Sequence, residues 1–177
     1  MREGDSLILT GSAGAEGTLV MINNLTTKML LTPEDKKEAA VQYGKISCVL
    51  EGLVAAKYAN AAVSCADGGV LTALYKICQG SNMGAKIFEA DIPVSEMTSS
   101  VCREKLIDPL RLSSLGCMLI STTEPEALMA EFGKHEINCK LIGIATKKRE
   151  GVMITCIDGM IRPVAPNRPD ELTRIYA

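Results

Sequence analysis

Histidine, tryptophan and aromatic side chains in general are scarce in this sequence. The one histidine, His135, excludes a site with two histidine ligands, and a Ser-His-Asp or Cys-His arrangement would have to use this residue. Tryptophan is absent and aromatic residues make up 3% of the chain, which argues against stacking platforms for single-stranded nucleic acid. His135 follows the expected end of a helix near Gly133, and we interpret it as a surface residue.

An excess of one charge sign is also missing. Nineteen basic and twenty-one acidic residues give a formal net charge of -2 and a pI near 5.5. No long basic run attracts phosphates, so we expect no nucleic-acid partner. With 47% hydrophobic and 23% charged residues over 177 positions, the composition is that of one ordinary globular domain rather than a disordered chain.

Long apolar runs and paired cysteine motifs are absent as well. No stretch approaches the ~20 apolar residues that span a bilayer, and the first residues do not form a signal peptide, so we expect no membrane partner. The seven cysteines contain no C-x-x-C spacing, which argues against a zinc ribbon or a thioredoxin-like motif. Their odd number predicts reduced, mostly buried thiols in a cytoplasmic protein, with one reactive nucleophile as the alternative.

Short apolar runs alternate with helical stripes, a pattern that predicts an α/β fold. Strands are expected at residues 6–10, 61–65, 85–92, 117–121, 139–145, 152–157 and 161–164. Helices are expected at residues 19–30, 33–59 with a bend at Gly44, 70–78, 93–106, 125–133 and from 169, with a loop at 80–84. The strands on either side of residues 147–151 are interpreted as a hairpin, which favours a mixed sheet with helices packed on it over a purely parallel one. Asp158-Gly159 predicts another tight turn, after which the strand at 161–164 pairs back, and residues 123–126 predict a capping box for the helix at 125–133.

The first candidate site is the glycine-rich turn between the first expected strand and helix. It contains Gly11, Gly14 and Gly17. Backbone N–H groups at the positive end of a helix can bind phosphate, although this spacing is neither the dinucleotide fingerprint nor a P-loop. The alternative is a tight turn that lets the helix pack closely on the strand.

The second candidate site follows the strand at 61–65. Ser64 and Asp67 lie at the strand end, and Gly68 and Gly69 then open a helix, which is where open α/β sheets place ligands. Asp67 could hold a metal-bound phosphate or a water, and Ser64 could donate to an oxygen. The alternative is that Asp67 only caps the helix. A third and weaker candidate, residues 113–117, is more simply a structural turn.

Five segments in register carry a resemblance to a known family. They are residues 4–11, 14–18, 65–71, 107–110 and 141–143, and the final residues 170–175 extend the match. The series resembles the C-terminal domain of the aminoimidazole ribonucleotide (AIR) synthetase-related superfamily, which includes hydrogenase maturation proteins, thiamine monophosphate kinase and selenophosphate synthetase. The hydrogenase maturation branch is the most similar, and the resemblance covers nearly the whole chain.

The resemblance implies a three-layer α/β/α sandwich (α/β, or α+β) with a mixed sheet over residues 1–165, followed by a tail over 166–177. In such proteins a separate N-terminal domain supplies most contacts to ATP and metal and the main dimer contacts. This chain has no room for that domain, so it is an expected partner. The resemblance implies ATP and Mg²⁺ in the complete enzyme, neither bound to this chain alone, and a cytoplasmic homodimer.

The match is least complete in the expected binding segment. Relatives often carry Asp and Thr at the places of Ser64 and Ala66, and a Glu at the place of Leu115. The maturation branch uses a C-terminal Cys as its carbamoyl acceptor, whereas this chain ends in Ala177.

These differences limit which residues can be assigned a role. Asp67, Gly68 and Gly69 carry over best, Ser64 less well, and no catalytic residue or metal ligand is assigned. The expected role is the phosphate- and substrate-facing half of an ATP-dependent enzyme, inactive alone. The alternative is a non-catalytic interaction or regulatory module that keeps the fold.

Overall fold

A mixed sheet forms the centre of the molecule in the computed structural model, which describes residues 1–24, 32, 34, 37, 41, 46–165 and 168–176. The strands are β1 (Ser6–Thr10), β2 (Ala59–Ser64), β3 (Met83–Phe88), β4 (Met118–Thr122), β5 (Cys139–Lys147), β6 (Val152–Thr155) and β7 (Ile161–Pro163). The helices are α1 (Ala15–Asn23), α3 (Val49–Ala55), α4 (Gly69–Ser81), α5 (Glu96–Lys105), α6 (Pro125–Lys134) and α7 (Glu171–Tyr176). Short 3₁₀ turns, η1 (Glu89–Asp91), η2 (Pro109–Arg111) and η3 (Lys148–Glu150), complete the described elements.

The sheet has the strand order β2-β4-β1-β5-β3-β6-β7 over the described residues. The first strand of the chain lies near its middle and pairs antiparallel with both β4 and β5. Only the pair of β3 and β6 is parallel among the strand pairs of the described ranges. The predicted mixed sheet is therefore confirmed.

The alternation of side chains along β1 explains the layers on the two faces of the sheet. Leu7 and Leu9 are fully buried in the cluster that contains α4, whereas Ile8 is fully buried in the cluster of α3 and α6. Burying one such side chain contributes about 1.5–3 kcal/mol. The predicted α/β/α sandwich is confirmed.

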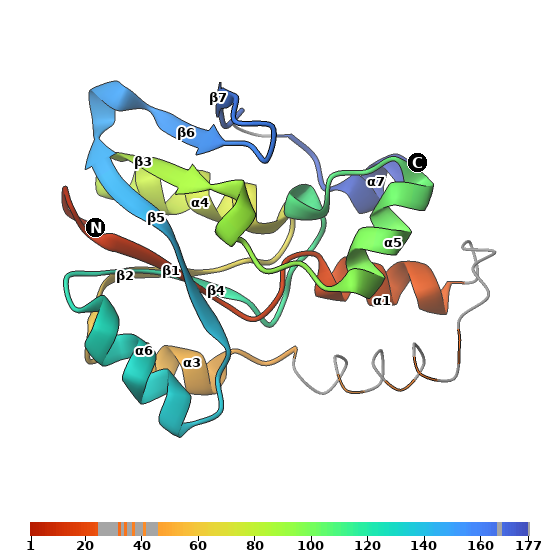
Figure 1. The fold of residues 1–177 in the computed structure, drawn as a ribbon, viewed down its shortest axis with the longest axis horizontal. Coiled ribbons are helices and arrows are strands. Elements are labelled where there is room, and N and C mark those ends of the chain that lie inside the picture. The colour runs from red at the N-terminus through yellow and green to blue at the C-terminus, as the bar shows by residue number, and fades with distance from the viewer. Residues whose placement is uncertain are drawn as a thin grey trace.

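A third cluster joins α1, α5 and α7, which Figure 1 shows grouped at one end of the sheet. The side chains that connect them include Met21 of α1, Val101 of α5 and, partly buried, Leu172 of α7. The C-terminal residues 171–176 therefore pack against helices from earlier parts of the chain. No helix of the described residues is long and apolar enough to cross a membrane.

The predicted hairpin around residues 147–151 is wrong. Strands β5 and β6 do not pair, because β3 lies between them, antiparallel to β5 and parallel to β6. The connection crosses the end of β3, where Gly151 O accepts a hydrogen bond from the Ala85 N–H at 3.0 Å. Gly84 permits this crossing, since a Cβ there would collide with the carbonyls of Lys147 and Gly151. The predicted turn at Asp158 is confirmed, because β6 and β7 pair antiparallel around it.

The continuous helix predicted up to residue 59 is also wrong. Residues 46–48 are not helical, α3 covers only seven residues, and β2 already begins at Ala59. Before α3, the Ser47 hydroxyl accepts a hydrogen bond from the Val49 N–H at 3.5 Å, a local bond of the kind that competes with helical structure. Most of residues 25–45, which include the predicted bend at Gly44 and the end of the first predicted helix, lie outside the described residues.

Two local predictions differ from the structure at element boundaries. The predicted loop at 80–84 is wrong, because α4 continues to Ser81 and one left-handed residue, Asn82, leads directly into β3. The helix α6 begins after Glu124, which makes no side-chain capping bond. Instead the Thr122 hydroxyl accepts from the Glu124 N–H at 3.0 Å, so the predicted capping box is absent at this end.

Candidate functional site

The three candidate turns meet at one end of the sheet. The strands β1 and β2 both end there, and β4 begins between them. The Cys65 N–H donates to Cys117 O at 2.9 Å, and the Met118 N–H donates to the Thr10 hydroxyl at 3.0 Å. We call the predicted site residues gathered here the strand-end corner: Gly11, Gly14, Ser64, Asp67, Gly68 and Gly69.

The glycine turn after β1 is closely packed and its amides have acceptors. Gly11 and Gly14 both adopt positive φ, +73° and +71°. The Gly14 N–H donates to the Ser114 hydroxyl at 2.8 Å, and the Gly11 N–H donates to Asn138 O at 3.0 Å. A Cβ at Gly17 would collide with Leu112. This geometry is that of a tight turn with close packing.

The weakest sequence candidate, residues 113–117, joins the two glycine turns. The Ser113 hydroxyl and the Leu115 N–H both donate to Glu16 Oε2, at 2.6 and 3.0 Å. The Ser114 N–H donates to Ala66 O at 3.4 Å, on the other side of the segment. The sequence analysis did not single out Glu16, although an acid in the first turn after Gly14 is a usable signal.

A cavity of about 250 Å³ opens beside this segment. Its walls include Gly11, Glu16 and the half-exposed Leu115, together with the apolar side chains of Ile46 and Leu50. Glu16 belongs to the first turn of α1, directly after the first glycine turn. One predicted site residue, Gly11, therefore lines a cavity that is open to solvent.

The N-terminus of α4 holds a carboxylate from the end of the chain. Gly68, at φ +77°, precedes the helix, and its N–H donates to Asp170 Oδ2 at 2.7 Å. The Gly69 N–H donates to Ala66 O at 3.0 Å, and a Cβ at Gly69 would collide with the carbonyl of Leu110. Both amides of the pair therefore have acceptors, and one of these acceptors is an anionic side chain.

Asp170 is 4% exposed and accepts a second hydrogen bond, from the Leu172 N–H at 2.8 Å. Burial raises the pKa of this carboxyl group, while the N–H groups of Leu172 and Gly68 lower it and the carboxylates of Asp67 and Glu16 raise it further. Asp170 is thus a buried acid on the positive end of a helix. Asp170 was not among the predicted site residues, because it is 102 residues from Gly68 in the sequence and no local pattern links the two.

Asp67 and Ser64 lie at the same corner but make few bonds. Asp67 is exposed, and α4 has no side-chain cap, so the alternative of Asp67 as a simple helix cap is wrong. The Ser64 hydroxyl accepts from the Cys48 thiol at 3.8 Å. All seven cysteines are free and four of them are buried, as expected.

A resident magnesium ion does not fit these residues. Within the described ranges, no group of three or more His, Cys, Asp or Glu side chains is placed to hold a metal. At the corner, Asp170 is already bonded to two N–H groups, which leaves Asp67 as a single exposed carboxylate. Magnesium in protein sites takes several oxygen ligands in octahedral geometry, and the described part of this chain does not provide such a site.

The family of the chain follows from a match to a family model. The model of the AIR synthase related protein, C-terminal domain, matches residues 2–155. The chain belongs to this family. The resemblance inferred from the five sequence segments is thereby confirmed.

Two curated relatives place this AIR synthase-related domain near the hydrogenase maturation proteins. A protein of Methanocaldococcus jannaschii, named for hydrogenase expression/formation, is 29% identical over 163 residues, which are 90% of this chain and 47% of that protein. Carbamoyl dehydratase HypE of Rhizobium leguminosarum bv. viciae is 28% identical over 153 residues, 80% of this chain and 41% of that protein. The chain spans about half the length of the curated relatives it matches.

Solved structures share the fold of this AIR synthase-related domain. Escherichia coli HypE has a TM-score of 0.76 at 20% identity, covering 99% of this chain and 53% of that one. HypE in complex with ATP has a TM-score of 0.68 at 22% identity, covering 96% and 52%. AaThiL complexed with AMPPCP and TMP has a TM-score of 0.65 at 22% identity, covering 94% and 51%.

Proposed function

We propose that this domain is the phosphate- and substrate-facing half of an ATP-dependent enzyme of the hydrogenase maturation type. The family match and its coverage of about half of each relative support this role. ATP and an ATP analogue are bound in two structures of the same fold. In this proposal the partner is an N-terminal ATP-binding domain, the complete enzyme is a cytoplasmic homodimer, and this chain alone does not turn over ATP.

The observation that carries the proposal is the carboxylate on the N-terminus of α4. The bond from the Gly68 N–H to Asp170 Oδ2 is 2.7 Å long, in the range of a charge-assisted hydrogen bond. A phosphate oxygen of the substrate has the same acceptor chemistry and would take this place when Asp170 leaves it.

The other residues of the strand-end corner then have different roles. Gly69 lets the backbone of η2 approach the start of α4, and the Gly11 and Gly14 turns shape the neighbouring wall. Ser64 and the exposed Asp67 face the bound group, as a hydrogen-bond donor and as a carboxylate that orients it. The magnesium ion that accompanies ATP in such an enzyme would take its ligands from outside this chain.

The test is the Asp67→Asn substitution in the complete protein that carries this domain. Because a positioning carboxylate is lost, ATP turnover is expected to fall by about tenfold or more in kcat/KM. Asp91→Asn, an exposed acid in η1, is the matched control and should leave turnover unchanged. Unchanged turnover in Asp67→Asn would remove Asp67 from the mechanism, and ATP turnover by the 177-residue chain alone would contradict the half-enzyme proposal.

A non-catalytic module is the second candidate function. The observation in its favour is that both amides of the glycine pair already have acceptors within the chain, Asp170 for Gly68 and Ala66 for Gly69, which leaves neither amide free for a ligand. If the domain is a non-catalytic module, the complete protein shows no ATP turnover, and the Asp170→Ala substitution does not create any. Restored or increased turnover in Asp170→Ala would instead favour the enzyme.

A further inference from the structure

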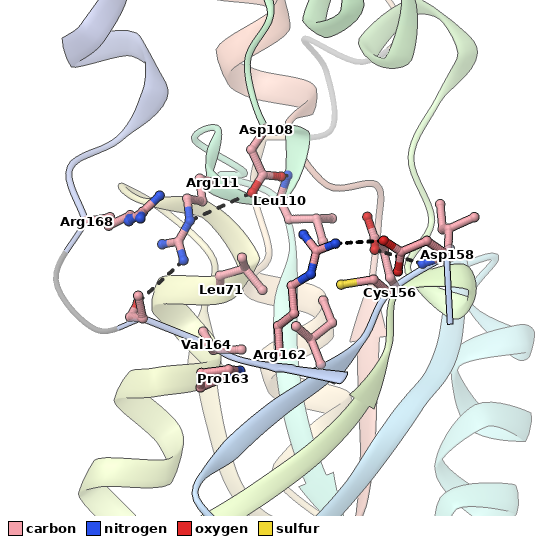
Figure 2. Close-up of a pocket in the computed structure, with 14 residues that line it drawn as sticks. Leu71, Asp108, Leu110, Arg111, Cys156, Asp158, Arg162, Pro163, Val164 and Arg168 are labelled. Carbon is pink, nitrogen blue, oxygen red and sulfur yellow. Dashed lines mark hydrogen bonds and ion pairs between the residues drawn. The ribbon is translucent and has the colours of Figure 1, made fainter. Parts of the chain in front are cut away.

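A second cavity, larger than the one beside the glycine turn, lies outside the strand-end corner. Its volume is about 710 Å³, a size typical of small-molecule sites. It opens between η2, the first turn of α4 and the hairpin of β6 and β7 (Figure 2). None of the six residues of the strand-end corner lines it.

Two guanidinium groups stand together on one wall of this cavity. Figure 2 shows the side chains of Arg111 and Arg168 side by side there. Arg111 is only 8% exposed, yet its Nε is 3.8 Å from Asp108 Oδ2 and its Nη2 is 3.5 Å from Ala165 O. Good hydrogen bonds of this type are about 2.7–3.2 Å long, so most donors of this buried guanidinium are poorly used.

Arg168 has no ion pair among the residues that the structure describes. Burial lowers the pKa of Arg111, Asp108 opposes this effect, and the neighbouring charge of Arg168 adds to it. Two like charges held this close repel each other, and the repulsion is relieved when an anion binds between them.

The acids of the cavity are largely occupied elsewhere. Asp158 forms an ion pair with Arg162 at 2.7 Å, and the Glu89 carboxylate accepts from the Ile157 N–H at 3.1 Å. Asp108 uses one oxygen to accept from the Leu110 N–H at 2.9 Å. Of the three acids in the lining, Asp108 is the one that lies against this wall, so one carboxylate faces the two guanidinium groups of Arg111 and Arg168.

Apolar side chains form another part of the cavity wall. Leu71 of α4, Leu110 of η2, Ile154 of β6 and Val164 contribute side chains to it. A wall of this kind favours the organic part of a ligand, while the guanidinium groups favour an anionic head. Planar guanidinium groups match phosphate and carboxylate oxygens by paired hydrogen bonds, and two of them suit a doubly charged phosphate best.

We infer that this cavity binds a phosphate-bearing small molecule, with its phosphate on Arg111 and Arg168 and its organic part against Leu71, Ile154 and Val164. The site goes beyond the proposed function, because it shares no residue with the strand-end corner and needs no ATP turnover. The cavity and the corner are nevertheless close neighbours. Leu71 and Gly69 share the first turn of α4, and Arg168 is two residues from Asp170, whose carboxylate accepts from the Gly68 N–H.

The test is equilibrium binding to the 177-residue chain by calorimetry, with inorganic phosphate and phenyl phosphate as probes. Phenyl phosphate is expected to bind more tightly than phosphate, since its ring meets the apolar wall. Arg168→Met should weaken phenyl phosphate binding about tenfold or more, the loss expected for charge-assisted hydrogen bonds. Because Arg168 is exposed, this variant should keep its fold, which a thermal unfolding curve verifies.

Two further variants make the result specific. Arg111→Lys keeps the buried charge but loses the planar fork, and binding should again weaken by about tenfold. Arg149→Met removes an equal charge from the exposed η3 turn and should leave binding unchanged. No saturable binding of phenyl phosphate, or an equal loss in Arg168→Met and Arg149→Met, would overturn the inference, whatever the outcome of the turnover assays.

Discussion

At the scale of single residues, Asp170 connects the predicted site to the C-terminal helix. Its carboxylate joins the start of α4 to the start of α7 through the N–H groups of Gly68 and Leu172. Replacing it by Ala would leave a buried donor without an acceptor, which typically costs about 1–3 kcal/mol. The group therefore contributes to stability as well as filling an anion position.

The raised pKa of Asp170 predicts a pH dependence of stability. In the unfolded chain the carboxyl group loses its proton near 3.8, and in the folded chain at a higher pH because of burial. Between these two values the folded state binds more protons, so Asp170 contributes less to the free energy of unfolding as the pH rises through this window.

Urea unfolding of the wild type and of Asp170→Asn from pH 4 upward measures this effect. The Asn side chain keeps an oxygen acceptor and does not titrate. The wild type should lose stability relative to Asp170→Asn as the pH rises from about 4 through the folded-state pKa. A wild type that gains stability relative to the variant over this range would contradict the expected sign.

Sequence reasoning found the glycines of the site but not their partners. An acid followed by two glycines after an apolar strand was enough to place a corner at Asp67, Gly68 and Gly69. It was not enough to find Asp170, or the pair of Arg111 and Arg168 in the second cavity, because these residues are brought to their places by tertiary contacts across the chain. Local patterns carry no information about such pairings.

At the scale of elements, the contact between α4 and η2 determines how the start of the helix is placed. Gly69 has φ +64°, and its Cα lies against the backbone carbonyls of Leu110 and Leu112. Residues other than glycine rarely adopt this positive φ, and the methyl group of an alanine would collide with these carbonyls, so a substitution requires the backbone to shift. Gly80, at the other end of the same helix, is exposed and has open space around it.

These two glycines give a matched pair of substitutions in one helix. Gly69→Ala should lower the free energy of unfolding by about 3 kcal/mol or more, through backbone strain and the clash with η2. Gly80→Ala should raise it by about 0.5–1 kcal/mol, because alanine favours the helix and restricts the unfolded chain. Urea denaturation of both variants measures these changes in the free energy of unfolding. Similar effects of the two substitutions would contradict the close contact between Gly69 and η2.

The prediction of elements succeeded where the signal was local. The strand at 6–10 and the turn at Asp158 follow from alternation and turn chemistry, and both are present. The hairpin of residues 139–157 failed because a strand from earlier in the chain, β3, was inserted between its two arms. The local sequences of β5 and β6 do not indicate that another strand lies between them.

At the scale of the whole molecule, β1 has the most protected position. It has strands on both sides, and its side chains are buried in clusters on both faces of the sheet. By contrast, β7 is at the end of the strand order and its three residues are exposed. Composition and alternation predicted a mixed α/β sheet, but strand order depends on long-range pairing that they do not encode.

Hydrogen exchange followed by mass spectrometry tests whether β1 is more protected than β7. Amides of β1 are expected to exchange most slowly, because they open only when the whole sheet opens. Amides of β7 should exchange much faster, through local opening at the edge. Equal protection of the two strands, or slower exchange in β7, would contradict the ranking.

The central position of β1 has a consequence for how the protein is made. Ribosomes deliver residues 6–10 well before the two neighbours of this strand, β4 and β5, which emerge only with residues 118–122 and 139–147. Until then a nascent chain carries an apolar strand with both edges unpaired, which is the kind of segment that associates with other chains. In this domain, β1 is therefore a segment that co-translational chaperones would have to shield until β4 and β5 are made.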